Sequence, residues 1–230
     1  MIRMLLLLDA APPRLAEELP QLREQSISAE LYRSIMPGEN SHALILGLDS
    51  EEQAGAFITN LSEFPATKAV FTSADMECYQ QQNFQIVSNV WTPDSQPNPA
   101  LAWPSRGKIR ILIQGCYQPN PDMVALTAQE VRDTRREPGC EQYTWFENVE
   151  LKHHWVLLEL WSDQQIYDAH WFGRVRSVEY RGDSGRVPAT PHRGAVSREF
   201  YRQQVFAFRY GRVEPATAAN LSHTIVWPNP

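Results

Sequence analysis

The sequence predicts an α+β fold in which two units with the same order of strands and helices pack sheet against sheet. Three observations support this fold: the order βαββαβ occurs twice, one octapeptide pattern occurs in both units, and a proline-rich stretch separates them. The 230 residues suffice for two domains of roughly 100 residues or more. We therefore expect a first unit at residues 1–92, a linker at 93–107 and a second unit at 108–230.

The first unit opens with an apolar run that is typical of a strand. Leucines at helical spacing follow, and Pro20 among them must either kink this helix or mark its true start. Pro37-Gly38 forms a turn between two further strands. The expected elements are a strand at 2–8, a helix around 15–22, strands at 30–36 and 42–48, a helix at 51–61 and a strand at 85–91.

The linker and the second unit follow from proline content and from alternation. Prolines and polar residues at 93–107 exclude a helix or a central strand there. Beyond the linker, alternating isoleucines predict a half-buried strand. The expected elements are a strand at 109–113, a helix around 124–131 that Pro138-Gly139 ends, strands at 141–147 and 153–161, a helix at 164–178, a short helix near Arg198 and a strand at 205–213.

The repeated octapeptide indicates a duplication. Glu77–Phe84 and Glu199–Phe206 share the pattern Glu-x-Tyr-x-Gln-Gln-x-Phe at an offset of 122 residues. A four-stranded sheet with both helices on one face leaves its other face apolar, so two such units stabilise each other by packing sheet on sheet. The sequence thus predicts that each chain is an intramolecular pseudo-dimer, which is either monomeric or forms a homodimer. The repeated Tyr79 and Tyr201 are expected to have a structural role at the seam between the two units.

Composition and charge exclude several classes of partner. The apolar run at residues 4–8 is far shorter than the roughly 20 residues of a membrane span. Three cysteines without CxxC spacing predict neither disulfides nor a thiolate zinc site, and we expect a cytoplasmic protein. The net charge of −6 argues against a nucleic-acid partner. His153 and His154 face opposite sides of a strand, which excludes joint metal ligation, and no GxGxxG or Walker spacing supports a nucleotide cofactor.

Three short motifs lie in order within the second unit. Gly139-Cys140-Glu141-Gln142-Tyr143 opens a strand, Leu157–Asp163 ends the next strand, and Ala169-His170 lies on the following helix. Together they resemble the antibiotic biosynthesis monooxygenase family, whose pattern is Gly-Cys-x-x-Tyr, Glu-x-Trp and a histidine on the next helix. The resemblance covers roughly residues 108–180.

This resemblance implies a ferredoxin-like dimeric α+β barrel with a pocket between the sheet and the helices of each unit. The family includes cofactor-free oxygenases that act on anthrones and quinols of aromatic polyketide pathways. We therefore expect a monooxygenase of secondary metabolism with a small aromatic substrate. Molecular oxygen would be its co-substrate, and no metal or organic cofactor would take part.

The first unit departs from the family pattern. In an alignment of the second helices, Phe57 stands where His170 stands, and no Glu-x-Trp precedes it. We therefore expect the first unit to be a degenerate structural partner and the second to carry the chemistry. The loop at 180–196 and the tail after Glu214 are additions that would cover a pocket mouth or exchange between the halves.

The strand at 153–161 divides its side chains between two faces, because successive residues of a strand point to opposite sides. One set is more uniformly apolar and is expected at the interface between the sheets: His154, Val156, Leu158 and Leu160. The other set would face the helices: Trp155, Leu157, Glu159 and Trp161.

His170 is either the catalytic base, because an unperturbed imidazole titrates at about 6.5, or a residue that only hydrogen-bonds a neighbouring strand. Arg174, four residues later on the same helix face, would keep His170 neutral and hold a substrate phenolate. Trp161 would stack on a polycyclic substrate or be plain core, and Tyr143 would donate a hydrogen bond to a substrate carbonyl or be an ordinary strand aromatic. Glu159 is either a buried acid or the partner of an arginine. The candidate substrate-binding residues are Trp161, Tyr143, Glu159 and Trp155.

Three alternatives stay open. A redox-neutral polyketide cyclase or dehydratase would use the same base and cation, since both reactions begin with an enolate. A haem-binding barrel would need an iron ligand, for which His170 or His192 are available. A binding or assembly module would result if side chains filled the pocket.

Overall fold

The computed structural model describes residues 1–36, 40–87, 90–93, 108–117, 123–170, 192–202, 208–209, 212–213 and 221–227. Its elements in the N-terminal half are β1 (Ile2–Leu8), α1 (Leu15–Glu24), β2 (Ser28–Ser34), β3 (His42–Leu48), α2 (Glu51–Thr59), the 3-10 helix η1 (Asn60–Glu63), α3 (Pro65–Ser73), β4 (Asp75–Val87) and β5 (Val90–Pro93). The C-terminal half has β6 (Ile109–Tyr117), α4 (Met123–Thr134), β7 (Cys140–Asn148), β8 (His154–Trp161), α5 (Gln164–Ala169), β9 (His192–Arg202), β10 (Phe208–Arg209), β11 (Arg212–Val213) and β12 (Leu221–Trp227).

The strands of the two halves follow the same order in space. The N-terminal half reads β4-β1-β3-β2 and the C-terminal half β9-β6-β8-β7, and neighbours within each half are antiparallel. β2 pairs with β7 at one junction, and β12 lies between β9 and β4 at the other. These pairings close one barrel from the two halves, which confirms the predicted α+β fold class.

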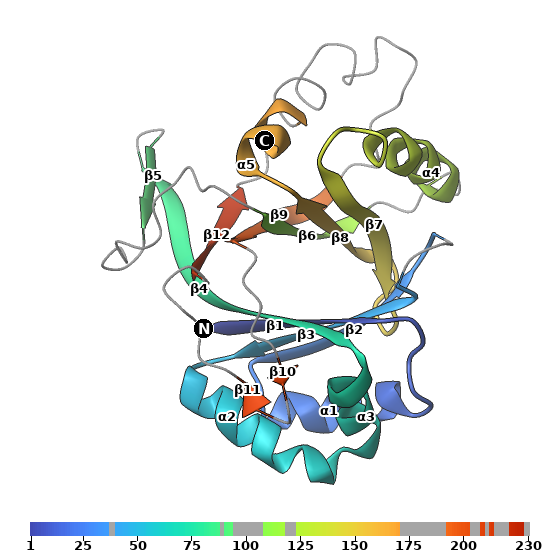
Figure 1. Ribbon diagram of the computed structural model, residues 1–230, viewed down its shortest axis with the longest axis vertical. Helices are drawn as coiled ribbons and strands as arrows, with labels where there is room; N and C mark the ends of the chain where they lie inside the picture. Colours follow the sequence, from blue (N-terminus) through green and yellow to red (C-terminus); the bar gives the residue numbers. More distant parts are fainter. Residues whose placement is uncertain are drawn as a thin grey trace.

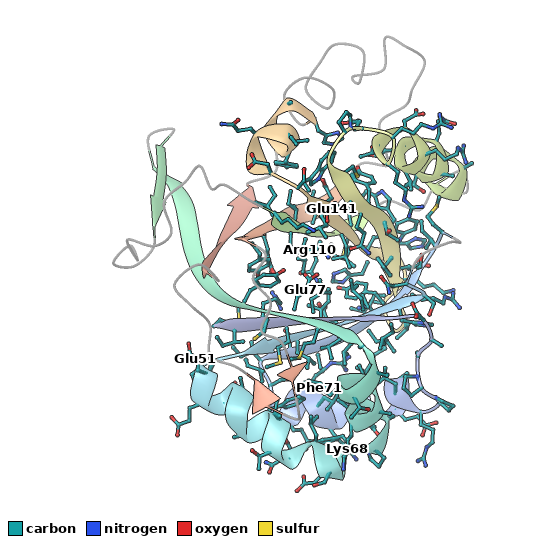
Figure 2. All side chains as sticks on the ribbon, viewed as in Figure 1. Glu51, Lys68, Phe71, Glu77, Arg110 and Glu141 are labelled. Atoms are coloured by element: carbon teal, nitrogen blue, oxygen red, sulfur yellow. The ribbon has the colours of Figure 1, made fainter. Side chains whose placement is uncertain are left out.

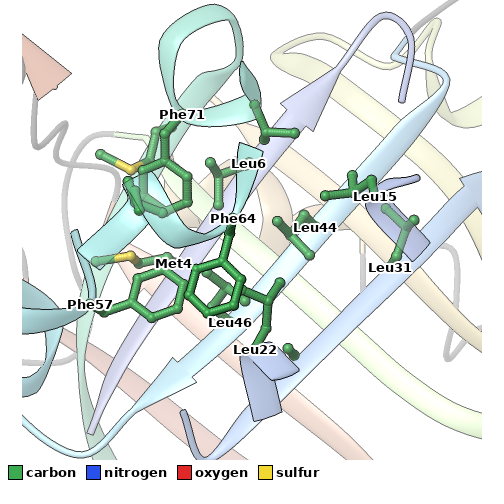
Figure 3. Close-up of a cluster of buried hydrophobic side chains, with 14 of the residues drawn as sticks. Met4, Leu6, Leu15, Leu22, Leu31, Leu44, Leu46, Phe57, Phe64 and Phe71 are labelled. Carbon is green, nitrogen blue, oxygen red and sulfur yellow. The ribbon is translucent and has the colours of Figure 1, made fainter. Parts of the chain in front are cut away.

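The helices lie on the outside of this barrel (Figure 1). α1, α2 and α3 cover the outer face of the N-terminal strands, and α4 and α5 cover the outer face of the C-terminal ones. Between the N-terminal strands and their helices lies an aliphatic and aromatic core, which includes Phe57, Phe64 and Phe71 (Figure 3). No helix in the described ranges is long and apolar enough to cross a membrane.

The spacing of the leucines predicted helix α1 correctly, whereas Pro20 does not mark its start. Leu15, Leu19 and Leu22 are buried on one face, as their spacing requires. The helix begins at Leu15 after the left-handed Arg14, so of the two roles expected for Pro20, that of marking the start of the helix is wrong. Pro20 lies on the exposed side of the helix.

Several other elements differ from the sequence prediction. α3 was not expected, and β4 begins at Asp75 instead of residue 85. The short helix near Arg198 is wrong, because this residue lies in strand β9. The predicted strand at 205–213 contains the short hairpin strands β10 and β11, its other residues lying outside the described ranges. The predicted helix at 164–178 is described as α5 to Ala169, and the rest of that range also lies outside.

The barrel interior joins the inner faces of the two halves. Its apolar residues come from both halves: Leu5, Leu7, Tyr32, Ala43, Ile45, Tyr79, Leu112, Phe146, Val156, Leu158 and Tyr201. Val156 and Leu158 belong to the set that alternation assigned to this interface. The predicted sheet-on-sheet packing therefore lies inside the barrel.

Two buried ion pairs cross the interior, each joining one half to the other. Arg110 on β6 donates from Nε and Nη2 to the two carboxylate oxygens of Glu77 on β4, at 2.8 and 2.7 Å. Arg3 on β1 binds Glu199 on β9 in the same bidentate way, at 2.9 and 2.5 Å. Figure 2 shows Glu77 and Arg110 approaching each other between the strands of the two halves. We call these four residues, with Tyr79 and Tyr201, the reciprocal clasp.

The tyrosines of the reciprocal clasp give it approximate two-fold symmetry. Tyr79 donates its hydroxyl proton to Glu77, Tyr201 donates to Glu199, and the two rings stack with centroids 4.5 Å apart. Arg3 lies opposite Tyr79 in the β1–β4 register, just as Arg110 lies opposite Tyr201 in β6–β9. The Glu-x-Tyr of the repeated octapeptide therefore supplies both halves of the seam. Its two glutamines in the second copy, residues 203 and 204, lie outside the described ranges.

Burial and charge both shape the titration of the reciprocal clasp. Burial alone would lower the pKa of the Arg110 guanidinium, but Glu77 and Tyr79 outweigh it and the pKa is raised. The same balance, with Glu199 and Tyr201, raises the pKa of Arg3. Burial and the Glu77 carboxylate raise the pKa of Tyr79 well above its ordinary value. The reciprocal clasp therefore consists of charged arginines and neutral tyrosines at neutral pH.

We expect the free energy of unfolding to fall as the pH rises above about 10, where tyrosine ionises in an unfolded chain. Burial raises the pKa of both Tyr79 and Tyr32, with a further contribution from Glu77 and Glu30 respectively. The folded state keeps these protons while the unfolded state loses them, so stability is greatest below this pH. Tyrosinate absorbance and circular dichroism followed together should show late ionisation coinciding with unfolding. Ionisation of all eight tyrosines with the circular dichroism unchanged would contradict this expectation.

Gly47 should tolerate alanine poorly, because it faces Arg3. A Cβ there would lie 2.6 Å from Ser28 Oγ and 3.3 Å from Arg3 Nη1, whereas nothing lies within 4 Å of a Cβ at Gly55 in α2. We expect Gly47→Ala to lower the free energy of unfolding by about 1–3 kcal/mol. The matched change Gly55→Ala should raise it by up to about 1 kcal/mol, since alanine favours a helix. Urea unfolding measures both, and an unaffected Gly47→Ala would mean that the Ser28 and Arg3 side chains can move aside.

Candidate functional site

The candidate site lies on the outer face of the C-terminal strands, beneath α4 and α5. Its core is rich in large aromatic side chains: Tyr143, Trp145, Trp155, Trp161 and Tyr167, with Ile109, Ile111, Ile113, Val131 and Leu157. Trp155, Leu157 and Trp161 come from the set that alternation directed toward the helices. The two faces of β8 thus serve different cores, one inside the barrel and one outside it.

His170 ends α5 and points into this aromatic cluster. Asp163 caps the N-terminus of the helix, its carboxylate accepting from Gln165 N, and His170 follows the last helical residue, Ala169. The imidazole is buried, 4.7 Å from the Trp161 ring between centroids and 6.1 Å from the Tyr143 ring. Its Nδ1 lies 2.8 Å from Glu137 Oε2. The structure therefore joins the predicted base to a carboxylate and to two of the predicted binding residues.

Sequence reasoning missed Glu137. It lies in the turn between α4 and β7, immediately before Pro138-Gly139, and its position beside this turn was the one available signal. Gly139 has φ +79°, and a Cβ there would lie 2.5 Å from Ser162 Oγ. Its carbonyl also accepts from Ser162 N at 2.8 Å. The turn is thus packed against the start of α5, which brings Glu137 to His170.

Tyr143 lies on β7 with its hydroxyl directed toward α4. The hydroxyl donates to Glu130 Oε1 at 2.8 Å. Arg135 ties the same region to α4, because its guanidinium donates to the Tyr143 carbonyl and to Thr144 Oγ1, both at 3.0 Å. The expected hydrogen bond from Tyr143 to a substrate therefore competes with Glu130 for one proton.

Glu159 and the tryptophans complete the described part of the site. Trp161 is fully buried and donates its indole N–H to Glu159 Oε2 at 2.7 Å, and Glu159 is itself buried. Glu159 is thus buried and bonded to Trp161, and the choice between a buried acid and the partner of an arginine stays a prediction. Trp155 packs edge to face on Trp145, with centroids 6.1 Å apart.

Arg174, Phe57 and possible metal ligands are the remaining points of the sequence prediction. Arg174 lies outside the described residues. In the N-terminal half, Phe57 is buried against Phe71 with centroids 5.9 Å apart, in an apolar setting (Figure 3). Among the described residues, no group of three or more His, Cys, Asp or Glu side chains is placed to hold a metal ion.

Three solved structures show a distant similarity to this chain. A proposed monooxygenase from Lactobacillus acidophilus NCFM is 12% identical, covers 86% of this chain and 90% of its own, and has a TM-score of 0.33. An anthrone oxidase-like protein is 11% identical, with coverage of 85% and 87% and a TM-score of 0.31. Rv0793 from Mycobacterium tuberculosis is 24% identical over 40% of this chain and 91% of its own, with a TM-score of 0.29.

The family comparison is specific to the C-terminal half. Among curated proteins, none matches this chain. Residues 121–171 match the family described as antibiotic biosynthesis monooxygenase. This range contains Glu130, Glu137, Tyr143, Trp161 and His170. The resemblance seen in the sequence is therefore confirmed, and residues 121–171 of this chain are similar to the antibiotic biosynthesis monooxygenase family.

Proposed function

We propose that this protein is a cofactor-independent monooxygenase that oxidises an electron-rich polycyclic phenol, anthrone or quinol. The observation that carries the proposal is the buried imidazole of His170, packed on Trp161 and bound to Glu137, within the segment that matches the family. The N-terminal half, with Phe57 at the aligned position, would then be a structural partner.

The proposed chemistry begins with removal of a substrate proton. Ground-state oxygen is a triplet, so it reacts readily only with a substrate that can give up one electron, such as a phenolate or enolate. His170 would take the proton, and the resulting anion would reduce oxygen. With an anthrone, one oxygen atom enters the product as a carbonyl and the other leaves as water with the two methylene hydrogens. The aromatic surroundings suit this step, because a dry site strengthens the interactions that hold charge.

The proposed roles of the other residues follow from their contacts. Trp161 holds one side of the imidazole, and Tyr143 approaches its edge. Arg174, four residues after His170, would hold the substrate anion as a cation. Glu159 would fix the Trp161 indole through its hydrogen bond.

A second candidate function follows from burial. The described candidate side chains are at most 5% exposed, as expected for a core filled by its own side chains. This observation favours a non-catalytic barrel module that binds or assembles with another molecule. Turnover separates the two candidates directly.

We expect oxygen uptake when the full chain is incubated with a panel of anthrones, naphthols and quinols in an oxygen electrode. The His170→Ala variant should lose about 10²- to 10⁴-fold in rate, the usual contribution of a positioned base. The matched change His42→Ala, on β3 in the other half, should keep the wild-type rate. Product masses should show one added oxygen atom or the corresponding quinone.

Three other outcomes of this experiment would contradict the proposal. A product formed without oxygen uptake would indicate the redox-neutral cyclase. An unchanged rate in His170→Ala would remove the proposed base. No reaction across the panel would favour the binding module.

A further inference from the structure

We propose that Glu137 is the positioning residue of this site, and that it makes Nε2 of His170 the atom that accepts the substrate proton. The catalytic part of this inference rests on the proposed function, whereas its structural part does not. Glu137 contributes no contact to a substrate in this account. It acts only through the imidazole.

The hydrogen bond determines which nitrogen carries the proton. A carboxylate oxygen can only accept, so the 2.8 Å contact between Glu137 Oε2 and His170 Nδ1 requires the proton on Nδ1. In the neutral ring, the lone pair then lies on Nε2. When Nε2 takes a second proton, the imidazolium forms beside a negative charge, which stabilises it.

His170 and Glu137 differ in how far their side chains are exposed to solvent. The His170 side chain is 3% exposed, whereas that of Glu137 is 25% exposed. A partly exposed carboxylate loses only part of its hydration, while a dry imidazole experiences a neighbouring charge with little screening. The pair therefore places a fixed negative charge at one nitrogen of a buried base.

The other groups around the imidazole do not compete for Nδ1 in the same way. Trp161 from β8 presents its ring and directs its indole N–H to Glu159. Tyr143 from β7 approaches with its ring and directs its proton to Glu130 on α4. Tyr167 from α5 itself lies 6.3 Å away between ring centroids. Of these described neighbours, Glu137 is the acid placed at the ring nitrogen.

The turn that carries Glu137 is held in place from two sides. On one side, Arg135 anchors the end of α4 to β7 through the Tyr143 carbonyl and Thr144. On the other side, Gly139 packs against Ser162 and Ile166 at the start of α5. Because α5 also carries His170, the turn and the base belong to one packed unit.

The test uses the full chain with ¹⁵N-labelled histidine, and NMR shifts of Nδ1 and Nε2 report the tautomer of His170. We expect the wild type to hold the proton on Nδ1. Glu137→Gln should reduce the population of this tautomer, because an amide can offer either an acceptor or a donor to the ring. The matched change Glu141→Gln removes an equal charge on β7, where Glu141 forms an exposed ion pair with Lys108. This variant should keep the wild-type tautomer. Urea unfolding of each variant confirms that it is folded.

Activity gives a second readout. In Glu137→Gln we expect kcat/KM to fall at least about 10-fold, by less than the roughly 10²- to 10⁴-fold loss expected on removing the base. Without the carboxylate the imidazole binds protons less tightly, so the acid limb of the pH profile should move to lower pH. A merely structural role would leave this limb in place.

The outcomes separate this inference from the proposed function. A wild type with the proton on Nε2, or a folded Glu137→Gln with an unchanged tautomer and pH profile, would overturn the role of Glu137. A wild type without turnover would defeat the proposed function, while the NMR result would still decide the tautomer.

Discussion

The architecture depends on an exchange of buried ion pairs between two halves of one chain. Arg3 of the N-terminal half binds Glu199 of the C-terminal half, and Arg110 returns the same contact to Glu77. Such pairs gain little net stability, because desolvation of the charges offsets their attraction. Removing one partner is costly, however, because it leaves a charge in the barrel interior. We infer that the exchange fixes how the two apolar faces meet, and that neither half satisfies its buried charges alone.

This constraint reaches the candidate site through strand alternation. β6 carries Arg110 on its inner face and Ile109 and Ile111 on its outer face, beneath the aromatic cluster. β8 does the same with Leu158 inside and Trp161 outside. When the inner side chains of a strand are held in the barrel interior, the position of its outer side chains is fixed as well. The segment that resembles the family carries His170, the proposed base, above these strands, while the N-terminal half supplies the opposite wall of the barrel.

The sequence predicted the parts that depend on local pattern. Alternation along 153–161 separated Val156 and Leu158 from Trp155 and Trp161 correctly, because a half-buried strand must alternate. The repeated Glu-x-Tyr pattern placed Tyr79 and Tyr201 at the seam. It did not indicate that this pattern lies within strands, and the residues around Arg198 were expected in a helix.

Long-range partners could not be predicted in the same way. Arg3 and Glu199 are 196 positions apart, and nothing near either residue indicates the other. Glu137 was missed for a similar reason, since its contact with His170 depends on how a tight turn packs on α5. In each case the folded topology brings the charges together, and local sequence does not identify the partner. The helix at 65–73 was missed because its short apolar spacing follows another helix closely.

The most direct test of the exchange between halves is a pair of double-mutant cycles on the free energy of unfolding. One cycle combines Arg3→Met with Glu199→Gln, and the other combines Arg3→Met with Glu77→Gln, which lies on the strand paired with β1. We expect a coupling of about 0.5–3 kcal/mol for Arg3 and Glu199. The coupling of Arg3 with Glu77 should be much smaller. Equal couplings, or a larger one with Glu77, would mean that each arginine is neutralised within its own half and would contradict the account.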